Sequence, residues 1–488
     1  MKKTYQLLKR SYVHPVVIID DLFSYQIHEN DIDHMIDKWL DCIDLMLNDT
    51  CLIETWFRCE SIDCHDVMVE LHMMFDKSRI KDDLKKAYHA SPRLGLLKPY
   101  DLQLKRIIKQ YDNKLINPMV LTQLADQWIV HAKRVMLDAC IKDFYHPVFI
   151  SLRYFDYRLL YRLHEKILGF MITGQQISAF DSMMADAYQI PVFDDSREIY
   201  EIESDLKRPP HYHASELNIY VSLSDIRGLS DIHSDWYKGI IYHSEYMMIA
   251  SGMMMPEADI LHVFETLFVT AKNKPIYLEI PNFTDHKRLA ADKMLRTEVN
   301  QFSMSHPGLK HWVNALEKAM RKHQPNITFI IPNINSKQDT LFWQTEMDIL
   351  KSHLKHKDIH IGMAIETETA LQYCEDFETY QTVLIKLDQL MIEYDIKLVN
   401  DIKDCMDVID DLKEAHYVYR VKQPTPHILS GKMISHQTIF RKFINMGFRH
   451  FAVQPNMLHH VAPVIREWEK TRGKFAKKDL PRVNIIEK

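Results

Sequence analysis

The spacing of apolar residues changes along the chain, and the changes divide it into three parts. Residues 29–142 carry apolar side chains at intervals of three and four, as in "DIDHMIDKWLDCIDLML" and "QLADQWIVHAKRVMLDAC". This is the period of an amphipathic helix, so the segment predicts a helical domain of packed hairpins. The flanking residues, 1–28 and 143–205, contain short apolar runs such as "PVVIID" and "KILGFMI". These runs predict a small α/β unit.

The third part, residues 215–488, follows the polar and proline-containing break "LKRPPHYHASE". Eight apolar runs then alternate with helical segments: "LNIYVSL", "GIIYH", "PIYLEI", "ITFIIP", "IHIGMAIE", "TVLIKL", "HILS" and "HFAVQ". Eight strands with crossover helices over roughly 265 residues is the size of a (β/α)₈ TIM barrel, whose chemistry sits at the C-terminal ends of the strands. We therefore predict a multidomain α/β protein that ends in a TIM barrel.

Composition narrows the class of protein. The chain is 46% hydrophobic and 26% charged, with a formal net charge of −6 and no basic block, so nucleic-acid binding has little support. No stretch approaches the ~18 uncharged apolar residues of a membrane helix, and the N-terminal residues lack the apolar run of a signal peptide. The seven cysteines form no C-x-x-C pair. We expect a cytoplasmic, reduced protein without a nucleic-acid or membrane partner.

Two residue counts bear on the chemistry. Glycine occurs only 11 times in 488 residues, about a third of the average usage of ~7%. Loops that cradle phosphate need glycine, because backbone N–H groups must approach the ligand closely, so this chain has few places to build one. Histidine occurs 27 times. His211 with His213, and His459 with His460, are spaced either to bind metal or to form ordinary hydrogen bonds in loops.

Several segments, taken in order, resemble one family. They are "VELHMMFDKSRIKDDLKK", "KILGFMITGQQISAFDSMMADAYQIPVF", "GIIYHSEYMM", "IGMAIETETA" and "FAVQPNMLHHVAPVIRE". Together they resemble enzyme I of the bacterial sugar phosphotransferase system, the phosphoenolpyruvate–protein phosphotransferase. The resemblance implies a swivelling phosphohistidine domain at 1–28 and 143–205. It also implies an inserted helical domain at 29–142 that docks the phosphocarrier protein. The barrel at 215–488 would bind phosphoenolpyruvate and Mg²⁺ and form a homodimer.

The residues at the family's catalytic positions have changed. The resemblance places the phosphorylated histidine at Phe180, whose ring has no lone pair to accept a phosphoryl group, so Phe180 either packs against a neighbour or anchors a partner. The proton-donating cysteine becomes Ser430, whose hydroxyl is far less acidic. Arginine positions of the phosphate clamp carry His243 and Glu279, and Lys432 replaces a glutamate. His243, Glu279 and Lys432 are the candidate ligand-binding residues, although a buried structural role for His243 stays open.

The resemblance also implies a metal site that retains only part of the family's ligands. Glu366 matches a metal-binding carboxylate of the family, and Asp388 with Gln389 replaces an Asn-Asp pair. Mg²⁺ prefers hard oxygen ligands, which these side chains offer. The alternative is that they are polar residues at strand ends. No other cofactor is expected.

The helical domain supplies the candidate partner surface. Glu70, His72 and Asp76 lie in its best-matched segment and are the candidates for contact with the phosphocarrier protein, the alternative being a solvated helix face. The principal interpretation is an enzyme I homologue that has lost its phosphorylatable histidine and arginine clamp and acts as a non-catalytic partner-binding or regulatory pseudoenzyme. One alternative is a barrel enzyme or sensor for a small anionic metabolite that uses the residual metal ligands. Another is a phosphotransferase that is still active.

Overall fold

The structure of this chain is a computed structural model. It describes residues 5–8, 13–19, 31–57, 61–111, 115–142, 144–145, 147–174, 177–194, 217–229, 232, 236–251, 255–281, 307–332, 334–354, 359–372, 380–394, 407–413, 415 and 426–475.

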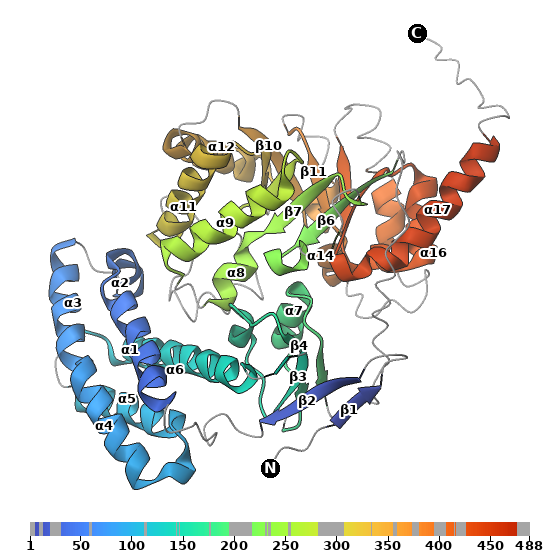
Figure 1. The fold of residues 1–488 in the computed structure, drawn as a ribbon. Helices are drawn as coiled ribbons and strands as arrows, with labels where there is room; N and C mark the ends of the chain where they lie inside the picture. The colour runs from blue at the N-terminus through green and yellow to red at the C-terminus, as the bar shows by residue number, and fades with distance from the viewer. Residues whose placement is uncertain are drawn as a thin grey trace.

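Helices α1 to α6 form the part of the molecule drawn in blue and cyan in Figure 1. Their apolar stripes face one another and bury large rings, among them Trp39 and Trp128, which packs edge-on against Phe75 with ring centroids 4.7 Å apart. Their bounds, with that of the 3₁₀ helix η3, are α1 Ile32–Leu47, α2 Thr50–Phe57, α3 Ser61–Met74, α4 Lys77–Ala90, η3 Pro92–Leu94, α5 Leu97–Gln110 and α6 Pro118–Ile141. The helical character expected for this segment is confirmed.

A five-stranded sheet lies beside the helices. Its strand order is β1-β2-β3-β4-β5; β1 runs antiparallel to β2, and the other neighbours are parallel. The elements are β1 Tyr5–Leu8, β2 Val13–Ile19, β3 Val148–Leu152, η4 Tyr157–Leu160, β4 Ile167–Ile172, α7 Ala179–Ala187 and β5 Val192–Asp194. Helices α1 to α6 therefore lie between β2 and β3 in the chain. The swivelling function and the exact domain boundaries stay predictions.

The C-terminal part is a closed barrel of eight parallel strands, in the order β10-β11-β12-β13-β6-β7-β8-β9. All eight predicted strands are present, so the TIM barrel is confirmed. The strands are β6 Asn218–Leu223, β7 Gly239–His243, β8 Ile276–Glu279, β9 Ile327–Ile331, β10 His360–Ile365, β11 Val383–Lys386, β12 His427–Ser430 and β13 His450–Val453.

Helices surround this barrel, as Figure 1 shows for α9, α11, α12, α16 and α17. The helical elements of this part are η5 Ile226–Leu229, α8 Ser244–Ala250, α9 Glu257–Ala271, α11 Pro307–His323, α12 Lys337–Leu354, α13 Glu368–Gln372, α14 Leu387–Glu393, η9 Lys432–Ser435, α16 Gln437–Met446, η10 Pro455–Met457 and α17 Leu458–Phe475. In the described part of the chain, no helix combines the length and the apolar composition that crossing a bilayer requires.

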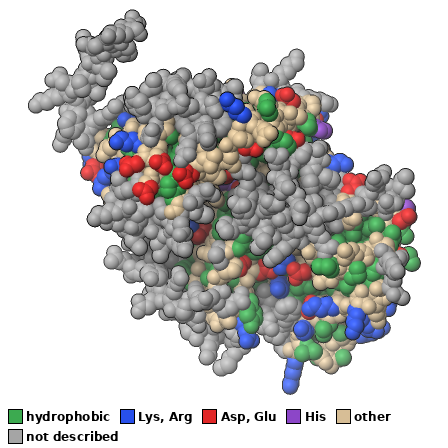
Figure 2. All heavy atoms as spheres, turned by 180° about the vertical axis from the view of Figure 1, so that it is seen from behind, with side chains coloured by type: hydrophobic (Ala, Val, Ile, Leu, Met, Phe, Trp, Pro, Cys, Tyr) green, Lys and Arg blue, Asp and Glu red, His purple; other side chains and the backbone are tan. Residues whose placement is uncertain are grey.

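The sheet domain faces the barrel through α7, which lies between the sheet and the barrel in Figure 1. The Nζ atom of Lys432 forms an ion pair with Asp186 of α7. The hydroxyl of Tyr188 donates to the carbonyl of Tyr246, at 3.4 Å. On the face that Figure 2 shows, acidic and basic side chains are interspersed, in keeping with the modest net charge. The contacts of Lys432 with Asp186 and of Tyr188 with Tyr246 place α7 over the C-terminal ends of the barrel strands.

Candidate functional site

The barrel interior is arranged in layers that follow from the two-residue period of a strand. One layer is apolar, and every strand contributes one residue to it: Tyr220, Ile241, Tyr277, Ile330, Ala364, Leu384, Ile428 and Ala452. Residues two positions further along a strand point in the same direction. On β13 this step reaches the half-buried Gln454, and on six other strands it reaches a buried polar residue: Ser222, His243, Glu279, Glu366, Lys386 and Ser430. All six are buried, and they form a polar layer at the C-terminal end of the barrel.

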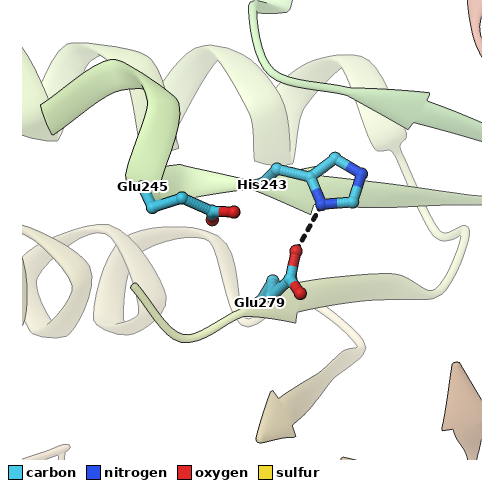
Figure 3. A group of neighbouring side chains, drawn as sticks. All are labelled: His243, Glu245 and Glu279. Carbon is cyan, nitrogen blue, oxygen red and sulfur yellow. Dashed lines mark hydrogen bonds and ion pairs between the residues drawn. The ribbon is translucent and has the colours of Figure 1, made fainter. Parts of the chain in front are cut away.

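Three of these side chains form a continuous hydrogen-bonded chain. The Oγ atom of Ser222 lies 2.7 Å from Nε2 of His243. On the other side of the ring, Nδ1 of His243 bonds Oε2 of Glu279, as Figure 3 shows. β6, β7 and β8 are neighbours in the barrel, which explains how single residues from three strands come into line. The arrangement is hydroxyl, imidazole and carboxylate, in the order of a serine nucleophile, its base and the group that orients the base.

Neighbouring groups keep the carboxylate of Glu279 ionised. Burial favours the neutral form of a carboxyl, but the charges of Lys386 and His243 outweigh it and hold the pKa of Glu279 well below its ordinary range. An ionised Glu279 accepts a hydrogen bond from Nδ1–H of His243, which leaves Nε2 free to accept the hydroxyl proton of Ser222. The hydroxyl of Ser244 donates to the backbone carbonyl of Glu279 at 2.8 Å and helps to fix this strand end.

Lys386 lies between two carboxylates. Its Nζ forms an ion pair with Oε1 of Glu279 and lies 2.7 Å from Oε1 of Glu366. Burial would lower the pKa of Lys386, but these two charges raise it well above its ordinary value, so the ammonium group stays charged. The lysine thus supplies the positive charge that the two buried carboxylates need.

Among the residues that the structure describes, one group of three side chains has the donor types and spacing to hold a metal ion. Ligand atoms of His243, Glu245 and Glu279 all lie within 4.8 Å of one another, and all three residues are buried. The carboxylate of Glu245 points toward the other two in Figure 3. Glu279, however, already bonds His243 and Lys386 through its two oxygens. The donor types suit a divalent cation, but Lys386 competes for the same carboxylate.

A cavity of about 90 Å³ opens above the polar layer. Its lining residues are Ala187, Ser222, Ser224, His243, Tyr246, Lys386, Asp388, Gln389, Ser430, Gly431, Lys432, Ala452 and Gln454. The lining combines three serine hydroxyls, one phenol, two amides, an imidazole, two ammonium groups and one carboxylate. Because a single water molecule needs about 10–15 Å³ of such a cavity, this one has room for a small molecule.

The rim of the cavity is shaped by Asp388 and Gly431. Both oxygens of Asp388 accept from the backbone N–H of Lys432, at 2.8 and 3.1 Å. Burial raises the pKa of Asp388, and the contact with Lys432 opposes this only in part. Gly431 has φ +140°, and a Cβ atom there would lie 2.8 Å from Oδ1 of Asp388. Glycine is therefore required at this turn for the carboxylate to reach the backbone.

The structure brings most of the sequence-predicted site residues to one place. His243, Lys432, Asp388, Gln389 and Ser430 line the cavity. Their assigned functions stay predictions.

Glu279 and Glu366 lie deeper, and both bond Lys386. Glu366 is thus engaged with an ammonium group rather than paired with Asp388. Glu279, which the resemblance placed at an arginine position of the phosphate clamp, is neutralised by Lys386. Mg²⁺ at Glu366, Asp388 and Gln389 stays a prediction.

Ser222 and Lys386 are site residues that the sequence analysis missed. Both occupy inward positions at the ends of predicted strands, in "IYVSL" and "VLIKL". The period of two would have found them: each lies two residues beyond an apolar inward residue, Tyr220 or Leu384.

Phe180 stands in the first turn of α7, and its ring packs edge-on against Tyr157, with centroids 4.9 Å apart. The neighbour-packing alternative for Phe180 agrees with this contact. The adjacent carboxylate of Asp181 accepts from the backbone N–H of Tyr157 at 3.0 Å. This end of α7 is therefore attached to η4 of its own domain.

The candidate partner surface has local structural functions. Asp76 caps α4 by accepting from the N–H of Arg79 at 2.7 Å, and His72 bonds Asn48 at 3.2 Å. Glu70 lies on α3. The phosphocarrier partner and the homodimer stay predictions. His211 and His213 lie outside the described residues, as does the side chain of His459.

No protein-family model matches this sequence, and no curated protein matches it. Solved structures match about half of this chain at low identity. Citrate synthase SbnG has 10% identity and a TM-score of 0.31, covering 53% of this chain and 95% of that one. The citrate lyase beta subunit of M. tuberculosis, in complex with oxaloacetate and magnesium, has 9% identity and a TM-score of 0.31, covering 51% and 97%. The malate synthase of Haloferax volcanii has 8% identity and a TM-score of 0.36, covering 52% and 74%.

These matches correct the family identification. The barrel resembles citrate lyase and malate synthase proteins rather than phosphoenolpyruvate-utilising enzyme I, so the identification as an enzyme I relative is wrong. The site agrees with the correction. The two clamp positions carry His243 and Glu279 bonded to each other, and Phe180 is packed on its own domain. Similarities of this size carry no information about substrate or reaction.

Proposed function

We propose that the barrel is an enzyme that acts on a small anionic metabolite, with Ser222 as the nucleophile and His243 as its base. The observation that carries the proposal is the chain from Ser222 through His243 to Glu279, at the floor of a cavity. A base within hydrogen-bond reach of a hydroxyl, and itself oriented by a carboxylate, is the arrangement that activates a serine.

The chemistry follows from the order of the groups. As Oγ of Ser222 forms a bond to an acyl carbon, its proton passes to Nε2 of His243. The imidazolium then gives that proton to the leaving group as the acyl–leaving-group bond breaks. Water, deprotonated by His243, releases the acyl group and restores the hydroxyl. Glu279 keeps its negative charge throughout and stabilises the imidazolium, because Lys386 holds its pKa low.

The lining favours a small anion as substrate. Two ammonium groups, Lys386 and Lys432, face the cavity. Lys386 is already paired with Glu279 and Glu366. Lys432 is paired with Asp186, so an anionic substrate would share these cations with carboxylates. Ser224, Ser430 and the amides supply further hydrogen-bond partners. A cavity of about 90 Å³ favours a small molecule. The substrate class is therefore a small, negatively charged ester or other activated acyl compound.

A serine-directed reagent tests the proposal. We expect a small alkyl fluorophosphonate to add once to the protein, at Ser222, as measured by intact-mass spectrometry and peptide mapping. His243→Gln should slow the labelling by about a hundred-fold or more, because general-base assistance contributes roughly 10²–10⁴ in rate. Ser222→Ala should abolish it. Ser224→Ala is the matched control, since Ser224 lines the same cavity. Labelling that is absent, or that persists unchanged in His243→Gln, would contradict the proposal.

A further inference from the structure

A second and larger cavity lies where the three parts of the molecule meet. It measures about 300 Å³ and is lined by residues of α1, α6, the segment after η4, and the start of α9: Lys38, Asp41, Cys42, Leu45, Met46, Gln127, His131, Arg134, Tyr161, Arg162, Ser251, Pro256 and Asp259. This is at the lower end of the size of small-molecule sites, about 300–1,000 Å³. None of these residues belongs to the polar layer of the barrel.

Two buried polar atoms in this lining lack a hydrogen-bond partner among the described residues. They are Nε of Arg134 and Oε1 of Gln127. Gln127 is 7% exposed. The guanidinium group of Arg134 lies over the ring of Tyr161, at 4.8 Å from its centroid. Leaving a buried donor or acceptor unpaired costs free energy, so both atoms call for a polar group inside the cavity.

The acidic residues of the lining are already paired. Asp259 bonds Arg162 and accepts from the hydroxyl of Tyr161 at 3.0 Å. Asp41 forms an ion pair with Lys77, at 2.7 Å. The backbone φ of Arg162 is +54°, which is uncommon for a residue other than glycine. The carboxylates of the lining are therefore satisfied by cations other than Lys38 and Arg134.

Apart from these paired residues, the charged side chains of the lining are Lys38 and Arg134, and both are positive. Burial lowers the pKa of His131 to about 4 and raises that of the Cys42 thiol to about 12, so both are neutral at pH 7. Burial also lowers the pKa of Arg134, and the charge of Asp156 opposes this only in part. In the described part of the chain, Lys38 and Arg134 form no ion pair. Leu45 and Met46 give the cavity an apolar wall.

We infer that this cavity binds an organic acid with an apolar body, whose anionic group meets Arg134 and whose apolar part lies along Leu45 and Met46. An anionic oxygen would satisfy the Nε donor of Arg134 by a charge-assisted hydrogen bond. A protonated or amide-bearing part of the ligand would satisfy Oε1 of Gln127. The ligand would contact the helical domain through α1 and α6 and the barrel through Pro256. Binding of the ligand would therefore connect the helical domain to the barrel.

The proposal is tested on the full chain with octanoate, 1-octanol and inorganic phosphate as probes, by isothermal titration calorimetry. Octanoate should bind at one site per chain and at least ten-fold more tightly than either other probe, because only octanoate offers both the charge and the apolar body. Arg134→Gln should weaken octanoate binding by at least ten-fold. Arg106→Gln on the exposed side of α5 is the matched control and should leave binding unchanged.

A second variant keeps the inference testable if Arg134→Gln does not fold. Leu45 is 54% exposed, so Leu45→Trp can fill the cavity from its rim without removing a charge. It should also weaken octanoate binding by at least ten-fold. Three results would overturn the inference: no binding of any probe, which would indicate a water-filled cavity; octanol or phosphate binding as tightly as octanoate; or octanoate binding unaffected by both substitutions.

Discussion

Lys386 balances the polar layer of the barrel. Its ammonium group bonds Glu279 and Glu366, which come from β8 and the end of β10. A carboxylate in a buried site is costly unless it is paired, and a buried pair is sensitive to loss of one partner. The same lysine keeps Glu279 ionised, and an ionised Glu279 sets the tautomer of His243. Stability and the proposed chemistry therefore depend on one side chain.

Replacing Lys386 by methionine should destabilise the protein at pH 7 by about 3–5 kcal/mol, the cost of leaving buried charges uncompensated. The wild-type pKa of Glu279 is depressed, so its stabilising contribution is present above the ordinary pKa of 4.5 and is lost as pH falls through the depressed value. Without Lys386 that depression is lost, so the deficit should be smaller at pH 4.5 than at pH 7. Denaturant unfolding at both pH values measures it.

Lys351→Met, on the solvent-facing side of α12, is the control for this prediction. Lys351 pairs with Asp348 at 3.6 Å on the surface, where an ion pair is worth little. Equal losses in the two variants, or a Lys386→Met deficit that does not change with pH, would show that the buried ammonium does not balance the glutamates.

At the same scale, the sequence predicted part of the site. His243, Glu279 and Glu366 were found because they end apolar runs, and Ser222 and Lys386 were missed although they end such runs too. The pairing of Lys386 with Glu279 was beyond sequence reasoning. β11 and β8 are not neighbours in the barrel, so their contact depends on the width of the closed interior rather than on any spacing along the chain.

At the scale of elements, periodicity predicted the architecture well. Each of the eight barrel strands was an apolar run between turn residues, and the helical part followed the three-and-four spacing. The family was predicted wrongly, because short apolar segments in a common order recur wherever strands and helices alternate. The helix α7 shows the difficulty: its strand–turn–helix pattern was visible, but the contacts of Phe180 and Asp181 with η4 were not.

Phe180→Ala should loosen α7 from η4. The ring of Phe180 is half-buried and packs edge-on against Tyr157. An aromatic pair of this kind is worth about 0.5–1.5 kcal/mol beyond its buried area. We expect a loss of roughly 1–2 kcal/mol in denaturant unfolding, and a smaller loss for Phe180→Leu, which keeps most of the apolar contact. An unchanged Phe180→Ala would mean that the ring does not hold the helix.

For the whole molecule, the two cavities lie at opposite ends of one short helix. α8 begins directly after His243, in the polar layer, and ends directly before Ser251, which lines the larger cavity. The helical part also contacts the barrel through Asp49, which bonds His311 of α11 at 2.9 Å. Polar contacts thus help to join the three parts, and the contact between Asp49 and His311 responds to pH.

His311 should make the junction between the helical part and the barrel weaken as pH rises. Burial lowers the pKa of His311, but the hydrogen bond and charge of Asp49, with the charge of Glu257, raise it above 6.5 overall. A group whose folded pKa is raised stabilises the fold fully below its unfolded pKa, and the contribution disappears as pH rises through the folded value. Wild type should therefore exceed His311→Gln in stability by on the order of 1 kcal/mol at pH 6, and the difference should vanish well above the raised pKa. Thermal unfolding of both proteins across this range measures it. A difference that is constant with pH would contradict a charged His311 at the junction.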